Sequence, residues 1–369
     1  MMSKANQFRT YLVAGVACLS LLASCSTDED DGTTLPDGKY PMTFATSVEG
    51  LAATRAATAD GQWTTGDPIA VQVGGDVKQY TPTTAGNNSA TLSAASGTTP
   101  FYWQNTNSIS VTAWYYGTGY NATSPGGASW AVQSDQNASN GTGYQQSDFL
   151  YAPATSIAFN SSTGGTANSL AFHHQTAKVI INIKSAEAAT DASAIESVVI
   201  GHDNNLSLKG TYSMPTDNNT VGTWTPTTGT DDMGTIIAKK LTTAGTLAGG
   251  TTTALASYAA LVIPQQMKGK KFIAITLSDG SGGSNTYYYT PTQDSDANLQ
   301  GGQQHTYEIT VKHGYLSVTS SASPQWTGSG ETITGNGQTV TPGTDGNGSG
   351  WTQDGSDENI TGTEKSNNP

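Results

Sequence analysis

The sequence has little charge and almost no arginine. Of its 369 residues 12% are charged, and 15 Lys and Arg against 28 Asp and Glu give a net charge of -13. No basic stripe is present that could neutralise the phosphates of a nucleic acid, so we expect no nucleic-acid partner. The low charge also argues against a self-repelling disordered chain.

Long hydrophobic runs and amphipathic helices are also scarce. The hydrophobic share is 35%, which is low for a globular protein, and the chain has 43 glycines. The one clear apolar run, Tyr11 to Leu22, follows Lys4 and Arg9 and is too short for a stable membrane span. These features predict a secretory signal peptide over residues 1–24.

Cysteine is limited to Cys18, inside this signal, and Cys25, directly after it. The small residues Ala23 and Ser24 before Cys25 resemble a bacterial lipobox, in which the thiol is acylated, for example with palmitate, and the chain is cut before the cysteine. An ordinary signal peptide with an incidental cysteine is the alternative. A chain that starts at Cys25 has one cysteine and can form no internal disulfide.

An acidic tract, Ser26 to Asp31, follows Cys25. It keeps a tether solvated and extended, and it resembles the surface-export signal of Bacteroidetes lipoproteins. A plain solvated linker is the alternative. Both interpretations place the protein outside the inner membrane, and we expect it on the surface of the outer membrane.

Motifs for catalysis or for metal binding are missing. None of the five histidines belongs to a His-Glu-x-x-His helix or a Cys/His ligand pair; they are His173, His174, His202, His305 and His313. The adjacent His173 and His174 should point to opposite faces of a strand. Gly280 to Gly283 indicates a hairpin loop, and Asp203 to Asn205 lacks the spaced oxygen ligands of a calcium loop. We therefore expect no metal, no cofactor and no enzymatic activity.

Short runs with period-two alternation predict an all-β fold. The clearest candidates for strands are 42–48, 69–73, 109–113, 179–183, 197–200, 206–209, 259–263, 272–277, 286–289 and 306–311. A small, polar run from Ser185 to Ser193 suggests a boundary between two domains. We expect two β-sandwich domains in tandem, residues 56–185 and 186–326, followed by a low-complexity tail, residues 327–369.

Aromatic residues are dense in the first half of the chain. They are Trp103, Trp114, Tyr115, Tyr116, Tyr120, Trp130 and Tyr144. Aromatic faces in loops can stack on sugar rings, but a sandwich of mostly small residues needs bulky side chains to fill its core. We therefore predict that these residues are mainly core.

Several segments, in this order along one chain, resemble the fimbrillin family, the type V pilins of Bacteroidales. Besides the lipobox at Cys25, they are Pro41–Thr46, Thr54–Ala56, Gly66–Val71, Asp148–Ala152, Leu170–Val179, Leu261–Gln266, Leu299–Val311 and Pro324–Trp326. Each segment alone is weak, and their order is more specific.

The resemblance implies a pilin that is exported as a lipoprotein and then cut by an arginine-specific or trypsin-like protease. The matching bond is Arg55-Ala56, and Arg55 is the only arginine after the signal peptide. Small residues surround it, as is typical of sites of proteolysis. An exposed linker arginine without a processing role is the alternative.

Cleavage there would remove residues 25–55 with the alternating strand of Met42, Phe44, Thr46 and Val48. The sheet edge exposed in this way is a template for a strand from a neighbouring subunit. We therefore expect a structural fimbrial subunit that acts in cell adhesion, whose partners are other pilin subunits, the processing protease and, before processing, the outer membrane.

The tail departs from the family's pattern for a stalk subunit, whose C-terminal strand is the donor. Its two alternating fragments, Thr332 to Thr334 and Gln338 to Thr341, carry one large apolar residue each, whereas a donor needs apolar side chains at every second position. A stalk and a tip position stay open, and Arg55 argues against an uncut anchor. The alternative from another class is a monomeric surface lipoprotein that binds a glycan or a host protein, and an enzyme ranks third.

Overall fold

The structure, a computed structural model, consists almost entirely of β-strands. It describes residues 34–35, 39–49, 58–84, 87–139, 142–159, 169–185, 195–216, 219–243, 256–278, 282–312, 315–323 and 338–340. Helical segments are limited there to α1 (Thr142–Gln146), η1 (Thr58–Asp60) and η3 (Thr230–Asp232). None of the helices in these ranges is long and apolar enough to cross a membrane. The prediction of an all-β chain is confirmed.

Seven strands of the first half form a closed barrel in the order β1-β4-β3-β2-β5-β7-β8. Their bounds are β1 Phe44–Val48, β2 Ile69–Val73, β3 Asp76–Pro82, β4 Ser89–Ala94, β5 Ile109–Tyr115, β7 Leu150–Ile157 and β8 Ser169–His174. Neighbouring strands are antiparallel except β1 and β8, which are parallel. The tight hairpin between β2 and β3 turns at Gly74, whose φ of 60° suits glycine.

This barrel differs from the sandwich that the sequence predicted for the first half. Two facing sheets would leave β1 and β8 as edges, whereas here Ala45 to Val48 pair in register with Ser169 to Phe172. The pairing joins segments more than a hundred residues apart, and alternation within each strand carries no information on it.

The second half is built mainly from a six-stranded sheet, β16-β17-β9-β20-β21-β22, and a four-stranded sheet, β15-β10-β18-β19. Their strands are β9 Ala177–Ser185, β10 Ile195–Ile200, β15 Ile236–Ile237, β16 Lys239–Thr243, β17 Ala256–Val262, β18 Ile273–Ser278, β19 Ser284–Tyr289, β20 Gln304–Lys312, β21 Tyr315–Ser323 and β22 Gln338–Val340. Buried side chains of both sheets, such as Ile181, Val198, Ile275 and Tyr307, share one core, so the two sheets pack face to face. The antiparallel pairing of β18 and β19 confirms the predicted hairpin around residues 280–283.

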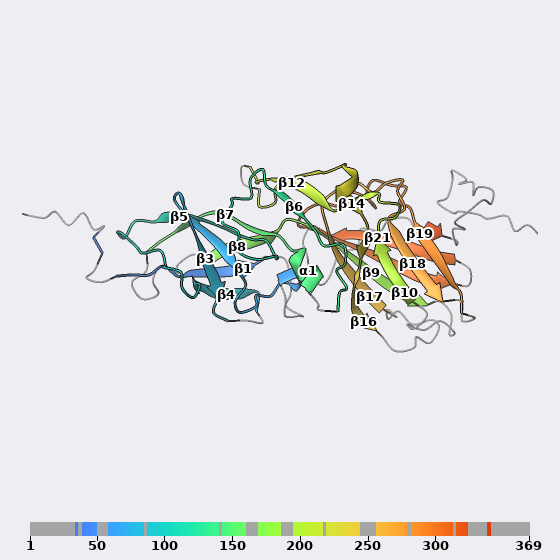
Figure 1. Cartoon of the computed structure of the whole chain (residues 1–369), viewed down its shortest axis with the longest axis horizontal. Helices are drawn as coiled ribbons and strands as arrows, with labels where there is room; N and C mark the ends of the chain where they lie inside the picture. The colour runs from blue at the N-terminus through green and yellow to red at the C-terminus, as the bar shows by residue number, and fades with distance from the viewer. Residues whose placement is uncertain are drawn as a thin grey trace, which may run out of the picture.

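The two halves are joined through a short sheet near the middle of an elongated molecule, and we call this region the junction (Figure 1). Strand β12 (Lys209–Ser213) pairs with β6 (Ser129–Ala131) on one side and with β13 (Thr223–Pro226) on the other. A small β11-β14 pair (Leu206–Ser207 and Met233–Gly234) lies nearby in the chain, so the single strand predicted over residues 206–209 is divided between two sheets. Ser207 marks this break, because its hydroxyl oxygen lies 2.7 Å from both the Lys209 and the Thr227 carbonyl oxygens and can donate its one hydrogen to either.

Aromatic side chains fill the junction between the two halves. Phe149 contacts Trp130, Tyr212 and Trp224, with ring centroids 4.7 to 5.8 Å apart. Of the seven aromatic residues singled out in the sequence, six are buried and only Tyr120, at 39% exposure, is exposed. The prediction that they are mainly core is therefore confirmed. Trp114, Tyr116 and Trp130 belong to the core that the two halves share, whereas Trp103 and Tyr115 belong to the barrel core.

Strand pairing changes partners before the boundary predicted between residues 185 and 186. β8 belongs to the barrel and ends at His174, whereas β9 begins at Ala177 and pairs with β17 and β20 of the second half. The small, polar run that suggested the boundary comes between β9 of the six-stranded sheet and β10 of the four-stranded sheet. Both of these sheets belong to the second half. The division into two domains stays a prediction, since one hydrophobic core contains residues of both halves.

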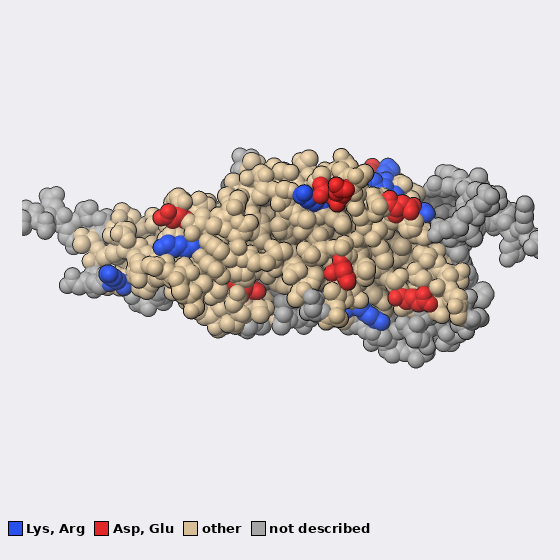
Figure 2. All heavy atoms as spheres, viewed as in Figure 1, with Lys and Arg blue, Asp and Glu red and all other residues tan. Residues whose placement is uncertain are grey.

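Charged side chains are sparse and scattered over the visible face (Figure 2). The ion pairs of the described residues are correspondingly few, and several of them are exposed, such as Lys268 with Asp294. Exposed pairs of this kind contribute little to stability. The stability of this fold therefore rests on its cores and on its strand ladders.

One buried histidine makes stability depend on pH. Burial lowers the pKa of His305 to about 4, and its Nε2 accepts the Gln300 N–H at 3.2 Å. The unfolded chain takes up this proton near pH 6.5 and the folded chain does not, so stability is lost as pH falls from 6.5 towards 4.

We therefore expect His305→Gln, whose amide oxygen can accept the same hydrogen bond, to remove about 2 kcal/mol of the stability difference between pH 7 and pH 5. Urea unfolding of the parent and the variant at both pH values measures the difference, and other titrating groups cancel in the comparison. Equal pH dependence of the two chains would contradict the role of His305.

Candidate functional site

The candidate site is strand β1, which lies between two barrel strands. It runs antiparallel to β4, with Phe44 opposite Leu92, and parallel to β8, with Val48 opposite Phe172. Both of its backbone edges are therefore paired. Among the strands of the barrel, β1 is the one that closes the ring between β4 and β8.

The four residues predicted for this strand all point into the barrel. Met42, Phe44, Thr46 and Val48 are exposed by only 4%, 0%, 1% and 1%. Alternation with half-buried neighbours is regular, as expected from the sequence. The strand thus supplies one wall of the barrel core.

Aromatic and polar contacts fix these side chains. The Phe44 ring lies edge-on to Tyr80, with centroids 5.2 Å apart. The Thr46 hydroxyl donates to the buried Leu170 carbonyl of β8 at 3.1 Å. The side chains of β1 are therefore held by packing inside the barrel and by one hydrogen bond to β8.

Backbone hydrogen bonds extend past both ends of β1. The Met42 N–H donates to the Phe101 carbonyl and the Val48 N–H to the Asn88 carbonyl, at 2.8 and 2.7 Å. The Glu49 N–H donates to Phe172 of β8 at 2.8 Å. The segment is held along its whole length, from Pro41 to Glu49.

The predicted lipidation and processing residues, Cys25, Arg55 and Ala56, lie outside the described residues. The described residues before this position end at Glu49, and the next ones begin at Thr58. The predicted cleavage position therefore falls between β1 and η1, two segments whose surroundings the structure does describe.

η1, directly after the predicted cleavage position, is fastened to other elements. The buried Ala59 accepts a hydrogen bond from Lys178 Nζ of β9 at 3.0 Å, and its N–H donates to Gln145 of α1 at 3.3 Å. Lys178 also reaches Asp60 Oδ1 at 3.3 Å, and both side chains are at most 9% exposed. Residues from Thr58 onward are thus anchored independently of β1.

A second buried polar pair lies at the end of β8. His174 Nδ1 and Asp148 Oδ1 are 2.9 Å apart, and both side chains are nearly inaccessible. Burial lowers the pKa of His174, against the raising effect of the Asp148 carboxylate. His173 is only half-buried, which confirms the prediction that the two adjacent histidines face opposite ways.

Other polar residues considered in the sequence occupy ordinary structural positions. Asp203 and Asn204 lie in a turn with a φ of 53° each, a conformation that these two residue types tolerate. Within the described ranges, no group of three or more His, Cys, Asp or Glu is arranged to hold a metal ion. His313 lies outside them.

Two features of the site were missed in the sequence. The parallel partner β8 carries the alternating Leu170, Phe172 and His174; the sequence analysis assigned only His173 and His174 to a strand and did not identify the pairing with β1. The anchor between Lys178 and Asp60 joins residues 118 positions apart, and no local pattern indicates it.

The sequence model of a family described as fimbrillin-like matches residues 54–326. No curated protein matches the chain.

Solved structures of low sequence identity share the fold. A "putative cell adhesion protein" from Bacteroides uniformis is 19% identical, with a TM-score of 0.52 over 79% of this chain and 100% of that one. One of the same description from Bacteroides ovatus is 18% identical, with a TM-score of 0.53 over 77% of this chain and 96% of that one.

Proposed function

Because the chain belongs to the fimbrillin-like family, we propose that it is a structural subunit of a surface fimbrium that acts in adhesion. In this proposal the subunit is exported as a lipoprotein acylated at Cys25 and is activated by cleavage between Arg55 and Ala56. The observation that carries the proposal is the place of β1, a buried strand paired on both sides and followed by the single arginine beyond the signal peptide.

Loss of β1 would leave two unpaired strand edges and an apolar groove. β4 and β8 would each present free backbone donors and acceptors, and Leu92, Tyr80 and Phe172 would lose their cover. Such an edge accepts another strand readily. We infer that a strand from a second subunit takes this place, with apolar side chains at every second position.

The anchors after the cleavage position support this mechanism. Lys178 and Gln145 hold η1, so removal of residues 25–55 need not loosen the chain from Thr58 onward.

The C-terminal tail is a weak candidate for the donor. Its described segment, β22, pairs with β21 at the edge of the six-stranded sheet and contains Val340 as its one large apolar residue. We propose a stalk or tip position in the fimbrium, because an uncut anchor would have no use for Arg55.

The experiment that tests the proposal uses the lipid-free chain from residue 26 and an arginine-specific endoprotease. We expect a new N-terminal mass that begins at Ala56 and, on incubation, a ladder of oligomers that survives mild denaturation in an electrophoresis gel. A chain that is cut but stays monomeric, or one that resists cutting, would instead favour the monomeric surface lipoprotein.

A further inference from the structure

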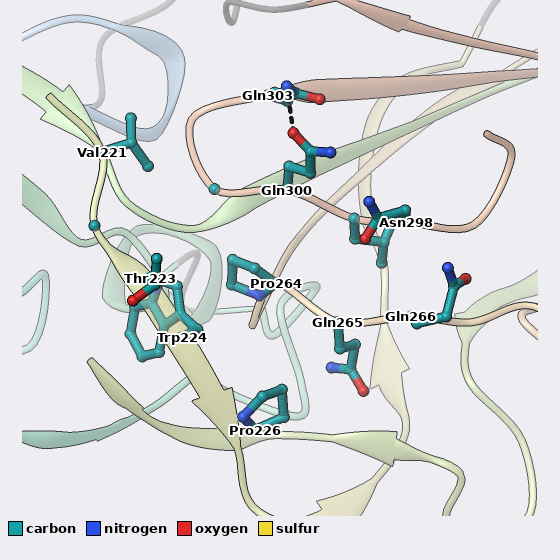
Figure 3. Close-up of a pocket in the computed structure, with 13 residues that line it drawn as sticks. Val221, Thr223, Trp224, Pro226, Pro264, Gln265, Gln266, Asn298, Gln300 and Gln303 are labelled. Carbon is teal, nitrogen blue, oxygen red and sulfur yellow. Dashed lines mark hydrogen bonds between the residues drawn. The ribbon is translucent and has the colours of Figure 1, made fainter. Parts of the chain in front are cut away.

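A polar pocket lies on the second half of the molecule, away from β1. Its volume is about 690 Å³, within the range of pockets that hold small molecules. Three segments form its walls: residues 221–226 with β13, the turn 264–266 after β17, and the loop 298–303 before β20 (Figure 3).

None of the described residues that line this pocket is charged, and their polar groups are mainly side-chain amides. Asn298, Gln300 and Gln303 come from one loop, and Gln266 comes from the facing turn. An amide both donates and accepts hydrogen bonds, as a hydroxyl does. Such a lining suits a neutral ligand with many hydroxyls better than an ion.

Two of these amides have hydrogen-bonding capacity to spare. Within the part of the chain that the structure describes, the Asn298 side chain makes no hydrogen bond. Gln300 Oε1 accepts from Gln303 Nε2 at 2.8 Å, which leaves the two Nε2 hydrogens of Gln300 for a ligand. The Gln265 amide, by contrast, is already engaged: its oxygen accepts from the Ser207 N–H, and its nitrogen donates to the Ser207 and Ile263 carbonyls.

The lower part of the pocket in Figure 3 carries its apolar side chains. Figure 3 shows the indole of Trp224 with Pro226 and Pro264 below the amides of Gln300 and Gln303. Trp224 is held by its own Nε1, which donates to the Gln175 carbonyl at 2.7 Å. An indole and proline side chains that face amides can contact the C–H face of a sugar ring while the amides hydrogen-bond to its hydroxyls.

The walls are fixed before any ligand arrives. The Leu299 N–H donates to the Gln265 carbonyl at 3.0 Å, and the Gly302 N–H to the Thr176 carbonyl at 2.9 Å. The buried His305 accepts the Gln300 N–H, as described above. Little backbone ordering entropy is therefore lost on binding.

From this geometry we propose that the pocket is a binding site for a neutral saccharide. The amides of Asn298 and Gln300 contact its hydroxyls, and the wall formed by Trp224, Pro226 and Pro264 supports its ring. An extended peptide fits less well, because Pro226 offers no N–H for pairing at the edge of β13.

The test uses the uncut, lipid-free chain from residue 26, so it does not depend on assembly. Cellotriose, maltotriose and the trimer of N-acetylglucosamine are the neutral probes, 3′-sialyllactose is the acidic probe, and a synthetic peptide of residues 40–49 is the extended probe. Saturation-transfer NMR detects binding, and titration calorimetry gives the affinity.

We expect at least one neutral trisaccharide to bind with a dissociation constant of about 1 mM or lower. Asn298→Ala and Gln300→Ala should each weaken that binding about three- to tenfold. Asn285→Ala, an exposed asparagine of β19 outside the pocket, is the matched control and should bind as the parent does.

Three results would overturn the proposal. They are no binding by any of the three neutral probes, equal binding by the parent and by both pocket variants at an unchanged melting temperature, and preference for sialyllactose or the peptide over every neutral sugar. Because the uncut chain is used, failure here leaves the proposed fimbrial role untouched.

Discussion

Replacing Arg55 with glutamine is expected to abolish assembly. Arg55 is the only arginine after Arg9, so a variant chain that starts at residue 26 offers an arginine-specific protease no bond to cut. β1 would then stay between β4 and β8, and no edge would open for an incoming strand. Mass spectrometry of the N-terminus and the oligomer ladder in mild denaturant measure the effect.

Two matched variants sharpen this test. Lys39→Gln removes an exposed basic residue on the other side of β1 and should assemble as the parent does. Arg55→Lys should be cut at this position by trypsin and spared by the arginine-specific enzyme, so we expect it to assemble after trypsin treatment only. Normal assembly by the intact Arg55→Gln chain would exclude cleavage as the trigger.

Replacing Phe44 with alanine is expected to destabilise the uncut chain by about 3 to 5 kcal/mol. The side chain is fully buried and lies edge-on to Tyr80, so its removal leaves a cavity in the barrel core. Urea unfolding of the uncut parent and variant measures this loss.

The same substitution should have no effect after cleavage. If residues 26–55 leave, the processed parent and the processed Phe44→Ala variant have identical sequences and must unfold alike. Phe172→Ala, on the retained strand β8, should stay destabilising in both forms because Phe172 packs against Trp63, with ring centroids 5.1 Å apart. A difference that persists between the two processed proteins would mean that the cut segment remains bound.

Strands with strong alternation could be predicted from the sequence, and those without it could not. β1, β2, β5 and β9 carry large apolar residues at every second position and were found. In β4, Leu92 is the only fully buried residue among Ser, Thr and Ala, so no periodic signal marks it. Such segments form strands because they pair with neighbouring strands, and the tertiary fold determines which strands are their neighbours.

The candidate site was half predictable for the same reason. The inward face of β1 follows from alternation alone, whereas its position between β4 and β8 depends on pairing with a segment more than a hundred residues later. The anchor between Lys178 and Asp60 and the pocket around Asn298 also combine distant segments. Local sequence determines which side chains a strand presents, and the chain's topology determines what they meet.

The double pairing of β1 also has a kinetic consequence. After a cut at Arg55 the strand would no longer be covalently joined to η1, yet both hydrogen-bonded ladders and the buried Phe44 would still hold it. Its departure would be a local unfolding reaction with its own barrier, and the half-life of the nicked subunit would be set by that barrier and not by the protease. A subunit that is cut early would thus keep β1 bound for a time. An incoming strand that pairs with β4 stepwise, as β1 dissociates from it, would lower this barrier and speed up the exchange.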